Sequence, residues 1–392
     1  MIDAKLVAAS AEDLGVDSER LEAVFARAKR DVEDGVLPSA QVAVARQGRL
    51  AGMRTFGSAI QGGIEQPATD ETLYHIFSCT KAVVAAAAWL LFESGDLRLD
   101  ERVAEIIPEF GTNGKEIVTV EQLMLHAGGF PHAPFAPQYW GDRQARLEAF
   151  SRWRLNWPVD SRYEYHPTSS HWVLVEIIER RTGVEYKTFI RDRITGPMGL
   201  GELYVGRPAG HDHRVANVCW AGEPVEPPGG WGEVTPEAIL RSNDLRYSAI
   251  GAPGGSGVAS AATLALFYQP LIHGGVTAAG TRIMKAQTID FATAVRSKAH
   301  HIDRTTNVNA NRGLSIIVAG GDGNAHLRGF GRTCSARAFG HGGAGGQIAW
   351  GDPETGISVG YCTNGFVDYL TMGRRVTAIG SLASACVSGA PK

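Results

Sequence analysis

The sequence contains no apolar run that is long enough to cross a membrane. A membrane-spanning helix needs about 20 largely apolar residues in succession. The longest apolar run, from Ala82 to Phe92, fits a helix in a protein core instead. The N-terminal stretch also lacks the basic segment followed by an apolar segment that marks a secretory signal peptide. We therefore expect a cytoplasmic protein without a membrane partner.

Cysteine is scarce among the 392 residues, and its spacing matches neither a disulfide framework nor a zinc site. The five cysteines are an odd number, and no Cys-x-x-Cys pair occurs. Reduced thiols of a cytosolic protein are the better interpretation. The pairs His211/His213 and His300/His301 have no helical i, i+4 spacing and no cysteine partner. We expect them to be exposed loop residues, and we expect neither a metal nor a cofactor.

An excess of charge of one sign is absent as well. The chain has 38 basic and 41 acidic residues, a net charge of −3 at pH 7, and no block of like charges. Proteins that bind nucleic acid through electrostatics normally present a basic surface. The composition therefore argues against a nucleic-acid partner and is that of an ordinary globular protein.

The N-terminal quarter of the chain predicts a helix, a hairpin and a second helix. The first helix begins at Asp17 or Ser18, has one apolar face and ends at Gly35. Residues 39–57 alternate between apolar and polar around a Gln47-Gly48 turn, which is typical of a β-hairpin. A strongly apolar helix is predicted for residues 78–94.

The last third of the chain returns to strands. Residues 336–365 hold three strand-like runs, and residues 369–386 follow as a closing helix. The segment between the two ends is mainly helical in pattern. These observations predict an α+β fold with an antiparallel sheet flanked by helices. Residues 1–95 and 250–392 would form the sheet domain, residues 96–249 an inserted helical domain, and the active site would lie between them.

Ser78 and Lys81 are the first candidates for chemistry, at the start of the apolar helix. At i and i+3 their side chains share a helix face. A serine hydroxyl needs a neighbouring base to act as a nucleophile, and a lysine can serve when burial lowers its pKa. The alternative is a helix start with no further role, since serine and threonine commonly occupy such positions. Ser-x-x-Lys occurs once in this chain.

Two further segments are candidates for the same site. Tyr165 lies in a loop before a helix and can carry a proton if positive neighbours lower its pKa, although such a tyrosine often simply packs. The glycine-rich segment 339–350 leaves backbone N–H groups bare, and these can bind an oxyanion or merely form a turn. His341, within this segment, either contacts a substrate or packs.

Taken together, these segments resemble the signature motifs of the serine β-lactamase and penicillin-binding-protein superfamily. Ser78-Cys79-Thr80-Lys81 matches Ser-x-x-Lys, Tyr165-His166-Pro167 occupies the tyrosine motif, and His341-Gly342-Gly343 occupies the Lys-Thr-Gly motif. Their order and spacing agree with the family, and the resemblance extends over residues 20–385. The fold that it implies is the β-lactamase/transpeptidase-like fold.

The resemblance implies a mechanism through an acyl-enzyme on Ser78. Lys81 and Tyr165 would share the proton transfers, in an order that stays open. The backbone N–H groups of Ser78 and Ala344 would form the oxyanion hole. No metal or cofactor takes part in this scheme.

The third motif departs from that of the β-lactamases. It lacks lysine, and its His341-Gly342-Gly343 form is similar to that of family VIII carboxylesterases. Pro167 also replaces the asparagine of true β-lactamases. The resemblance therefore implies neutral esters or amides as substrates, with His341, Gly342 and Gly343 lining the pocket.

Aromatic residues of the inserted segment are candidates for the rest of the pocket. Such residues either shape an apolar pocket or pack the core, and we expect Phe130 and Trp172 at the substrate. The chain has no Gly-x-Ser-x-Gly elbow, which argues against an α/β-hydrolase. A serine carboxylesterase is thus the first hypothesis; an amidase, peptidase or weak β-lactamase, and a non-catalytic binding protein, remain as alternatives. The sequence does not set the oligomeric state.

Overall fold

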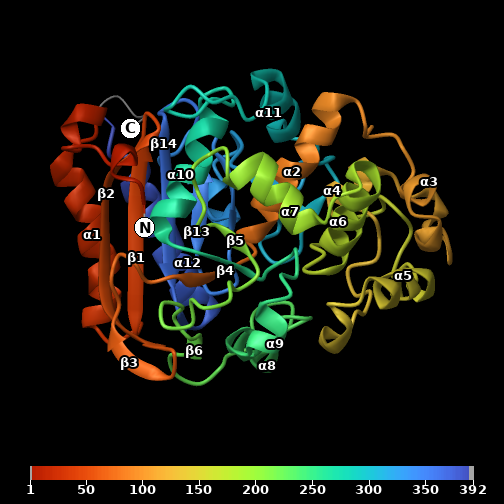
Figure 1. The fold of residues 1–392 in the computed structure, drawn as a ribbon, viewed down its shortest axis with the longest axis horizontal. Helices are drawn as coiled ribbons and strands as arrows, with labels where there is room; N and C mark the ends of the chain where they lie inside the picture. The colour runs from red at the N-terminus through yellow and green to blue at the C-terminus, as the bar shows by residue number, and fades with distance from the viewer. Residues whose placement is uncertain (1, 388–392) are drawn as a thin grey trace.

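The structure, a computed structural model that describes residues 2–387, is built on an eight-stranded antiparallel sheet (Figure 1). The strand order is β10-β11-β12-β13-β14-β1-β2-β3. Its strands are β1 (Ser39–Arg46), β2 (Arg49–Gln61), β3 (Ile64–Pro67), β10 (Arg312–Gly313), β11 (Ile316–Val318), β12 (Phe339–Gly342), β13 (Ile348–Gly351) and β14 (Ile357–Thr363). Both ends of the chain contribute strands, because β1 pairs with β14.

Shorter strands connect other parts of the chain. β4 (Tyr74–Phe77), β7 (Gly257–Ala259) and β5 (Tyr204–Val205) form a three-stranded sheet, β6 (Cys219–Trp220) pairs with β15 (Gly365–Phe366), and β8 (Ile302–Asp303) pairs with β9 (Val308–Asn309). The helices are α1 (Ser18–Glu33), α2 (Thr80–Ser94), α3 (Val103–Ile106), α4 (Val120–Met124), α5 (Arg143–Arg152), α6 (Ser169–Thr182), α7 (Tyr186–Ile190), α8 (Pro236–Leu240), α9 (Leu245–Ser248), α10 (Ala261–Ile272), α11 (Ala286–Thr293) and α12 (Tyr369–Ser384).

The large sheet is covered by helices on both faces. Alternate residues of a strand point to opposite faces, and in β1 Val42 and Val44 pack with α1 and α12, whereas Ala43 and Ala45 belong to the core that contains α2 and α10. Small side chains on the second face let α10 lie close to β1 and β14. The α+β architecture predicted from the sequence is therefore confirmed.

The predicted elements at the N-terminus agree closely with those observed. The Asp17 side chain accepts a hydrogen bond from the Arg20 N–H at the start of α1. Gln47 and Gly48 both have positive φ angles, 52° and 77°, in the turn between β1 and β2. Two consecutive positive φ angles are what a tight hairpin turn requires.

The apolar helix α2 begins two residues later than predicted. Phe77 ends β4 with a φ of 44°, and Ser78 and Cys79 form the turn that leads into the helix at Thr80. From Thr80 to Leu91 every side chain is buried, so α2 is a central helix. In Figure 1 it lies between the large sheet and the group α3–α6. No helix within residues 2–387 has the length and apolar character of a membrane span.

We keep the division into a sheet domain and an inserted domain at residues 96–249 as a proposal. In Figure 1, α3–α6 stand apart from the large sheet. Strands of the inserted segment nevertheless pair with strands of the chain ends, β5 with β7 and β6 with β15. The two parts thus share backbone hydrogen bonds, which hold the region between them in place.

A buried ion network joins α5 to α6. The Glu176 carboxylate is fully buried and pairs with Arg143 at 2.6 Å, Arg146 at 2.7 Å and Arg180 at 2.8 Å. The Arg146 guanidinium also lies 5.6 Å from the ring centre of Trp172. The network therefore fixes both the packing of the two helices and one aromatic ring.

Replacing Glu176 by glutamine is expected to lower the free energy of unfolding by about 3–5 kcal/mol, because three guanidinium groups lose the fully buried carboxylate that they share. Urea denaturation followed by circular dichroism measures the change. Glu148→Gln is the matched control: its ion pair with Arg152, at 4.0 Å, is exposed, and we expect a change below about 1 kcal/mol. Equal effects of the two substitutions would contradict this assignment.

Candidate active site

Ser78 lies in the turn between β4 and α2, at the edge of a cavity. The turn is held by Thr80, whose hydroxyl donates to the Phe77 carbonyl at 2.6 Å and accepts from the Gly257 N–H at 2.9 Å. The hydrogen bond from the Lys81 N–H to the Ser78 carbonyl, 3.0 Å, places the two residues on one side of the helix start. The side chains predicted to act together are thus brought together.

The Lys81 ammonium is buried among oxygen atoms. Its Nζ lies 3.3 Å from Ser78 Oγ, 2.7 Å from the Pro167 carbonyl and 2.5 Å from the Gly254 carbonyl. A side chain at position 254 would come within 2.6 Å of the Pro167 oxygen and 3.2 Å of Lys81 Nζ, so glycine permits this close approach. Burial, together with the charge of Arg312, lowers the pKa of Lys81 to about 7. A large fraction of this lysine is therefore neutral at neutral pH.

Tyr165 faces the same lysine. Its ring centre lies 5.0 Å from Lys81 Nζ and 5.3 Å from Arg312 Cζ. Its hydroxyl is buried and forms no hydrogen bond of normal geometry with the residues that the structure describes. Burial raises the pKa of Tyr165 to about 12, against the opposing effects of Ser78 and Arg312. A lowered tyrosine pKa was the condition suggested by the sequence, and it is not met, because the desolvation of the phenolate outweighs the positive neighbours.

Arg312 is a residue that sequence reasoning missed. It is buried on β10, and its guanidinium donates to the Tyr163 hydroxyl at 2.7 and 3.1 Å. Nη1 lies 3.5 Å from His341 Nε2. No carboxylate pairs with Arg312 among residues 2–387. Its positive charge therefore acts on the groups around it, which include Lys81 and Tyr165.

His341 is buried on β12 and lies beside Tyr165, with 5.9 Å between the ring centres. Burial and the charges of Arg312 and Lys81 hold the pKa of His341 well below its usual value. The imidazole is therefore neutral, with Nδ1 2.8 Å from the Gly342 carbonyl oxygen. This geometry permits a neutral hydrogen-bonding role but gives the third motif no cation of its own.

Ala344 lies opposite Ser78 on the glycine-rich turn after β12 and lines the same cavity. The neighbouring N–H groups are occupied, since Gly343 donates to the Gln347 carbonyl at 2.9 Å and Gly345 to the Gln347 side chain at 3.0 Å. No such bond engages the Ala344 N–H within the described chain. This donor is therefore available to a ligand.

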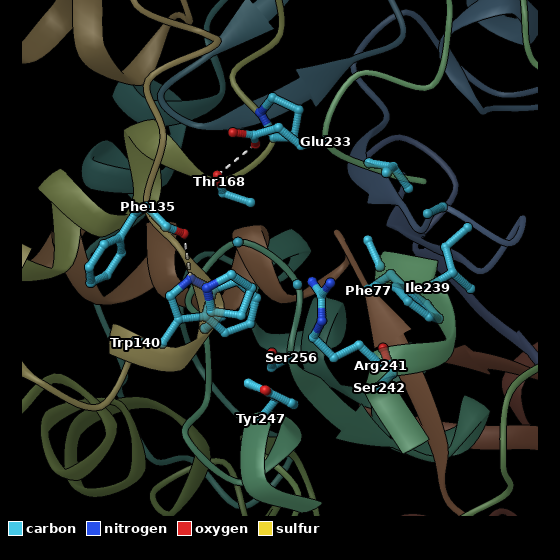
Figure 2. Close-up of a pocket in the computed structure, with 18 of the residues that line it drawn as sticks. Phe77, Phe135, Trp140, Thr168, Glu233, Ile239, Arg241, Ser242, Tyr247 and Ser256 are labelled. Carbon is cyan, nitrogen blue, oxygen red and sulfur yellow. Dashed lines mark hydrogen bonds between the residues drawn. The ribbon is translucent and has the colours of Figure 1, made fainter. Parts of the chain in front are cut away.

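The cavity has a volume of about 370 Å³, and Ser78 is among the residues that line it. Figure 2 shows side chains on its walls, from Phe135 and Trp140 to Ile239 and Tyr247. Its walls are mostly apolar and include the predicted Trp172. His341, Gly342 and Gly343, which were also expected to line the pocket, are not among the residues that line this cavity. Phe130 is also absent from the lining: it is fully buried in the core, 5.3 Å from the Phe110 ring and 6.1 Å from the Trp153 ring. The expectation that Phe130 contacts the substrate is therefore not supported.

Outside this cavity, one cluster of an aspartate and two histidines has side chains of the kinds that coordinate metal ions. Asp160, His300 and His301 bring one ligand atom each within 4.8 Å of one another. His301 is buried, so the expectation that both histidines are exposed is wrong for this residue. The Asp160 carboxylate bonds His301 at 3.0 Å and forms an ion pair with Lys298. These bonds join the loop of Asp160 to the loop before β8, which is a structural role.

Comparison with known proteins gives consistent matches over most of the chain. A family model described as Beta-lactamase matches residues 24–382. The chain is 26% identical over 329 residues to "Esterase/beta-lactamase LipL" of Mycobacterium tuberculosis. The aligned region covers 76% of this chain and 70% of that protein.

Solved structures show the same fold. A penicillin-binding protein homologue from Caulobacter crescentus matches with a TM-score of 0.79 and 28% identity, over 94% of this chain and 99% of that chain. A family VIII carboxylesterase matches with a TM-score of 0.76 and 24% identity, over 93% and 98% of the two chains. The fold that the motifs implied is confirmed.

Proposed function

Because the chain belongs to the Beta-lactamase family, we propose that it is a serine hydrolase that cleaves carboxylic esters through an acyl-enzyme on Ser78. The observation that carries the proposal is the distance of 3.3 Å between Ser78 Oγ and Lys81 Nζ, beside an apolar cavity. A nucleophile within hydrogen-bond reach of a base is the arrangement that covalent hydrolysis needs. The names of the similar proteins, an esterase/β-lactamase and a carboxylesterase, support this choice.

The first step follows from the protonation states. Neutral Lys81 takes the Ser78 proton while Oγ bonds to the ester carbonyl carbon, and the carbonyl electrons move to its oxygen. The N–H groups of Ser78 and Ala344 stabilise this oxyanion. Collapse of the intermediate breaks the bond to the alcohol oxygen, which receives a proton, and leaves the acyl group on Ser78. In the second half of the reaction, a water molecule gives up a proton and attacks the carbonyl carbon of the acyl-enzyme. The bond to Ser78 Oγ then breaks, Oγ regains a proton, and the acid is released.

Tyr165 is proposed as a proton donor rather than the first base. Its pKa of about 12 keeps the phenol protonated at neutral pH, whereas the pKa of Lys81 is about 7. A group that is already neutral and basic is the better acceptor of the serine proton. The phenol of Tyr165, next to Ser78, can then pass a proton to the leaving alcohol and regain one from Lys81.

An amidase or peptidase on the same scaffold is the second candidate, favoured by 25% identity over 393 residues to "Putative D-alanyl-D-alanine carboxypeptidase" of Escherichia coli. Rates for p-nitrophenyl butyrate, a chromogenic cephalosporin and a small anilide distinguish the two. We expect the ester to be cleaved fastest, and a cephalosporin or anilide rate above the ester rate would reverse the assignment.

We also propose a cytoplasmic location, which is supported by the observation that all five cysteines are free.

Arg312 is proposed to keep Lys81 neutral, and this role can be tested through pH. In Arg312→Met the loss of a positive charge raises the pKa of Lys81, so less of the lysine is neutral in acid. We expect kcat/KM for p-nitrophenyl butyrate to fall by about three- to tenfold more at pH 6 than at pH 9. Arg312→Lys keeps the charge and should largely restore the wild-type pH profile. Equal losses at both pH values would leave Arg312 with only a structural role at Tyr163.

A further inference from the structure

The cavity beside Ser78 has mostly apolar walls, and two ionisable side chains, Glu233 and Arg241, lie among them (Figure 2). Apolar side chains that include Phe135, Trp140 and Ile239 form the surrounding surface. The reaction proposed above uses neither charged group. Each therefore needs an explanation of its own.

Arg241 follows α8 in the short helical turn Arg241–Asn243, and its side chain points into the cavity (Figure 2). No hydrogen bond or ion pair engages its guanidinium within the part of the chain that the structure describes. The exposed carboxylate of Glu237 is close enough to interact with its charge but does not pair with it. The guanidinium lies over the Tyr247 ring, with 5.8 Å between Arg241 Cζ and the ring centre.

Two other arginines of this chain, the half-buried Arg214 and the buried Arg328, show how such a guanidinium binds a carboxylate. Arg214 binds Glu202 through two nitrogens, at 2.6 and 3.1 Å, and Arg328 binds Asp322 in the same way, at 2.6 and 2.5 Å. A guanidinium remains charged at every accessible pH and presents donors that match a carboxylate. Among the residues that line the cavity, Arg241 alone offers a guanidinium, and its donors are free to bind an anion in the same way.

Glu233 is not the anionic partner of Arg241. Its carboxylate accepts a hydrogen bond of 2.6 Å from the Thr168 hydroxyl, and no ion pair joins it to Arg241. Figure 2 shows the two side chains on different walls of the cavity. Burial raises the pKa of Glu233, against the opposing effects of the Thr168 bond and Lys81. Glu233 therefore belongs to the surroundings of the lysine, and Arg241 remains without an anionic partner.

We propose that Arg241 binds a carboxylate of the substrate, in the same mostly apolar cavity that Ser78 lines. This assignment rests on the proposed function and narrows it, from neutral esters to esters that carry a second, anionic group. Apolar walls strengthen the attraction, because charges there are screened less than in water. The cavity volume of about 370 Å³ leaves room for such an ester beside Ser78.

The test uses ester probes that differ in one terminal group. The acyl series consists of p-nitrophenyl esters of adipate, of monomethyl adipate and of 6-aminohexanoate. The alcohol series consists of 4-acetoxyphenylacetate and its methyl ester, since either part of the ester can occupy the cavity. In one of the two series we expect kcat/KM to be about 10- to 100-fold higher for the carboxylate than for the methyl ester. Arg241→Gln should reduce this ratio to near one and leave the rate for the methyl ester within about twofold of wild type.

Arg246→Gln is the matched control, because Arg246 lies on the adjacent helix α9, is exposed, and pairs with Asp244 outside the cavity. This variant should keep the wild-type preference. The proposal is overturned if neither series favours the carboxylate, if Arg241→Gln keeps the preference, or if the ammonium probe is favoured and Glu233→Gln removes that preference. In each of these cases Ser78-dependent cleavage of neutral esters would still stand.

A direct binding measurement keeps the two proposals separate. If wild type cleaves none of the esters in a Ser78-dependent manner, the proposed function fails. Titration calorimetry with adipic acid monoanilide and its methyl ester then tests Arg241 alone. Tighter binding of the free acid to wild type, lost in Arg241→Gln, supports the carboxylate site. Equal binding of the two compounds overturns it.

Discussion

Ser78→Ala is expected to lower kcat/KM for p-nitrophenyl butyrate by at least about 10⁴-fold, because no other group can form the acyl-enzyme. The change removes one oxygen at the half-buried edge of the cavity. The helix that follows is held by Thr80 and by its buried apolar side chains, so the fold should persist. Initial rates, together with the near-ultraviolet circular dichroism of the same samples, measure both effects.

Ser94→Ala is the control for this substitution. Ser94 lies at the opposite end of α2, is exposed, and bonds Leu90 and Asp96 rather than any residue of the cavity. We expect this variant to retain the wild-type rate. Ester turnover that persists in folded Ser78→Ala at more than about a hundredth of the wild-type rate would contradict nucleophilic catalysis by Ser78.

Lys81 should produce the second large effect, and its pH dependence has a definite sign. The lysine must be neutral to accept the serine proton, and its pKa is about 7. Below that pH the neutral fraction falls about tenfold per unit, so kcat/KM should fall by the same factor. Above pH 8 it should level off. Lys81→Met removes the base and should cost about 10²- to 10⁴-fold above pH 8, and less in acid, where the wild-type lysine is already protonated.

Lys81→Arg and Lys115→Met complete this experiment. An arginine keeps the positive charge but cannot lose its proton, so Lys81→Arg should be as inactive as Lys81→Met. Lys115 is also buried and bonds the carbonyls of Thr112 and Trp153, both at 2.6 Å, outside the cavity. In Lys115→Met, kcat/KM should still fall in acid below about pH 7, as it does in wild type. An acid limb that is unchanged when Lys81 is removed would contradict its role as the base.

Local patterns in the sequence predicted the elements that depend on neighbouring residues. The Asp17 cap of α1 and the Gln47-Gly48 turn follow from rules that act over a few positions, and both were found as expected. The pairing of Ser78 with Lys81 is of the same kind, since the residues are one helical turn apart. The start of α2 at Thr80 was not predicted. It follows from the left-handed conformation of Phe77, which the residue type does not indicate.

What the sequence did not reveal depends on long-range pairing and on burial. Arg312 reaches the site because it lies opposite Ile317, which in turn lies opposite Gly340, next to His341. No spacing rule links position 312 to the motifs. The pKa of Tyr165 follows the same logic: its positive neighbours suggested a lowered value, but the extent of desolvation is a property of the folded cavity. Phe130, likewise, is an aromatic residue near the motifs that the fold places in the core.

The most direct test of the account is to trap the covalent intermediate and locate it. A fluorophosphonate probe reacts with an activated serine, and digestion followed by mass spectrometry identifies the modified residue. We expect a single adduct on Ser78 in wild type and none in Ser78→Ala, with labelling that slows below pH 7 as Lys81 becomes protonated. An adduct on any other residue, or ester turnover that continues in fully labelled protein, would contradict the assignment of Ser78 as the nucleophile.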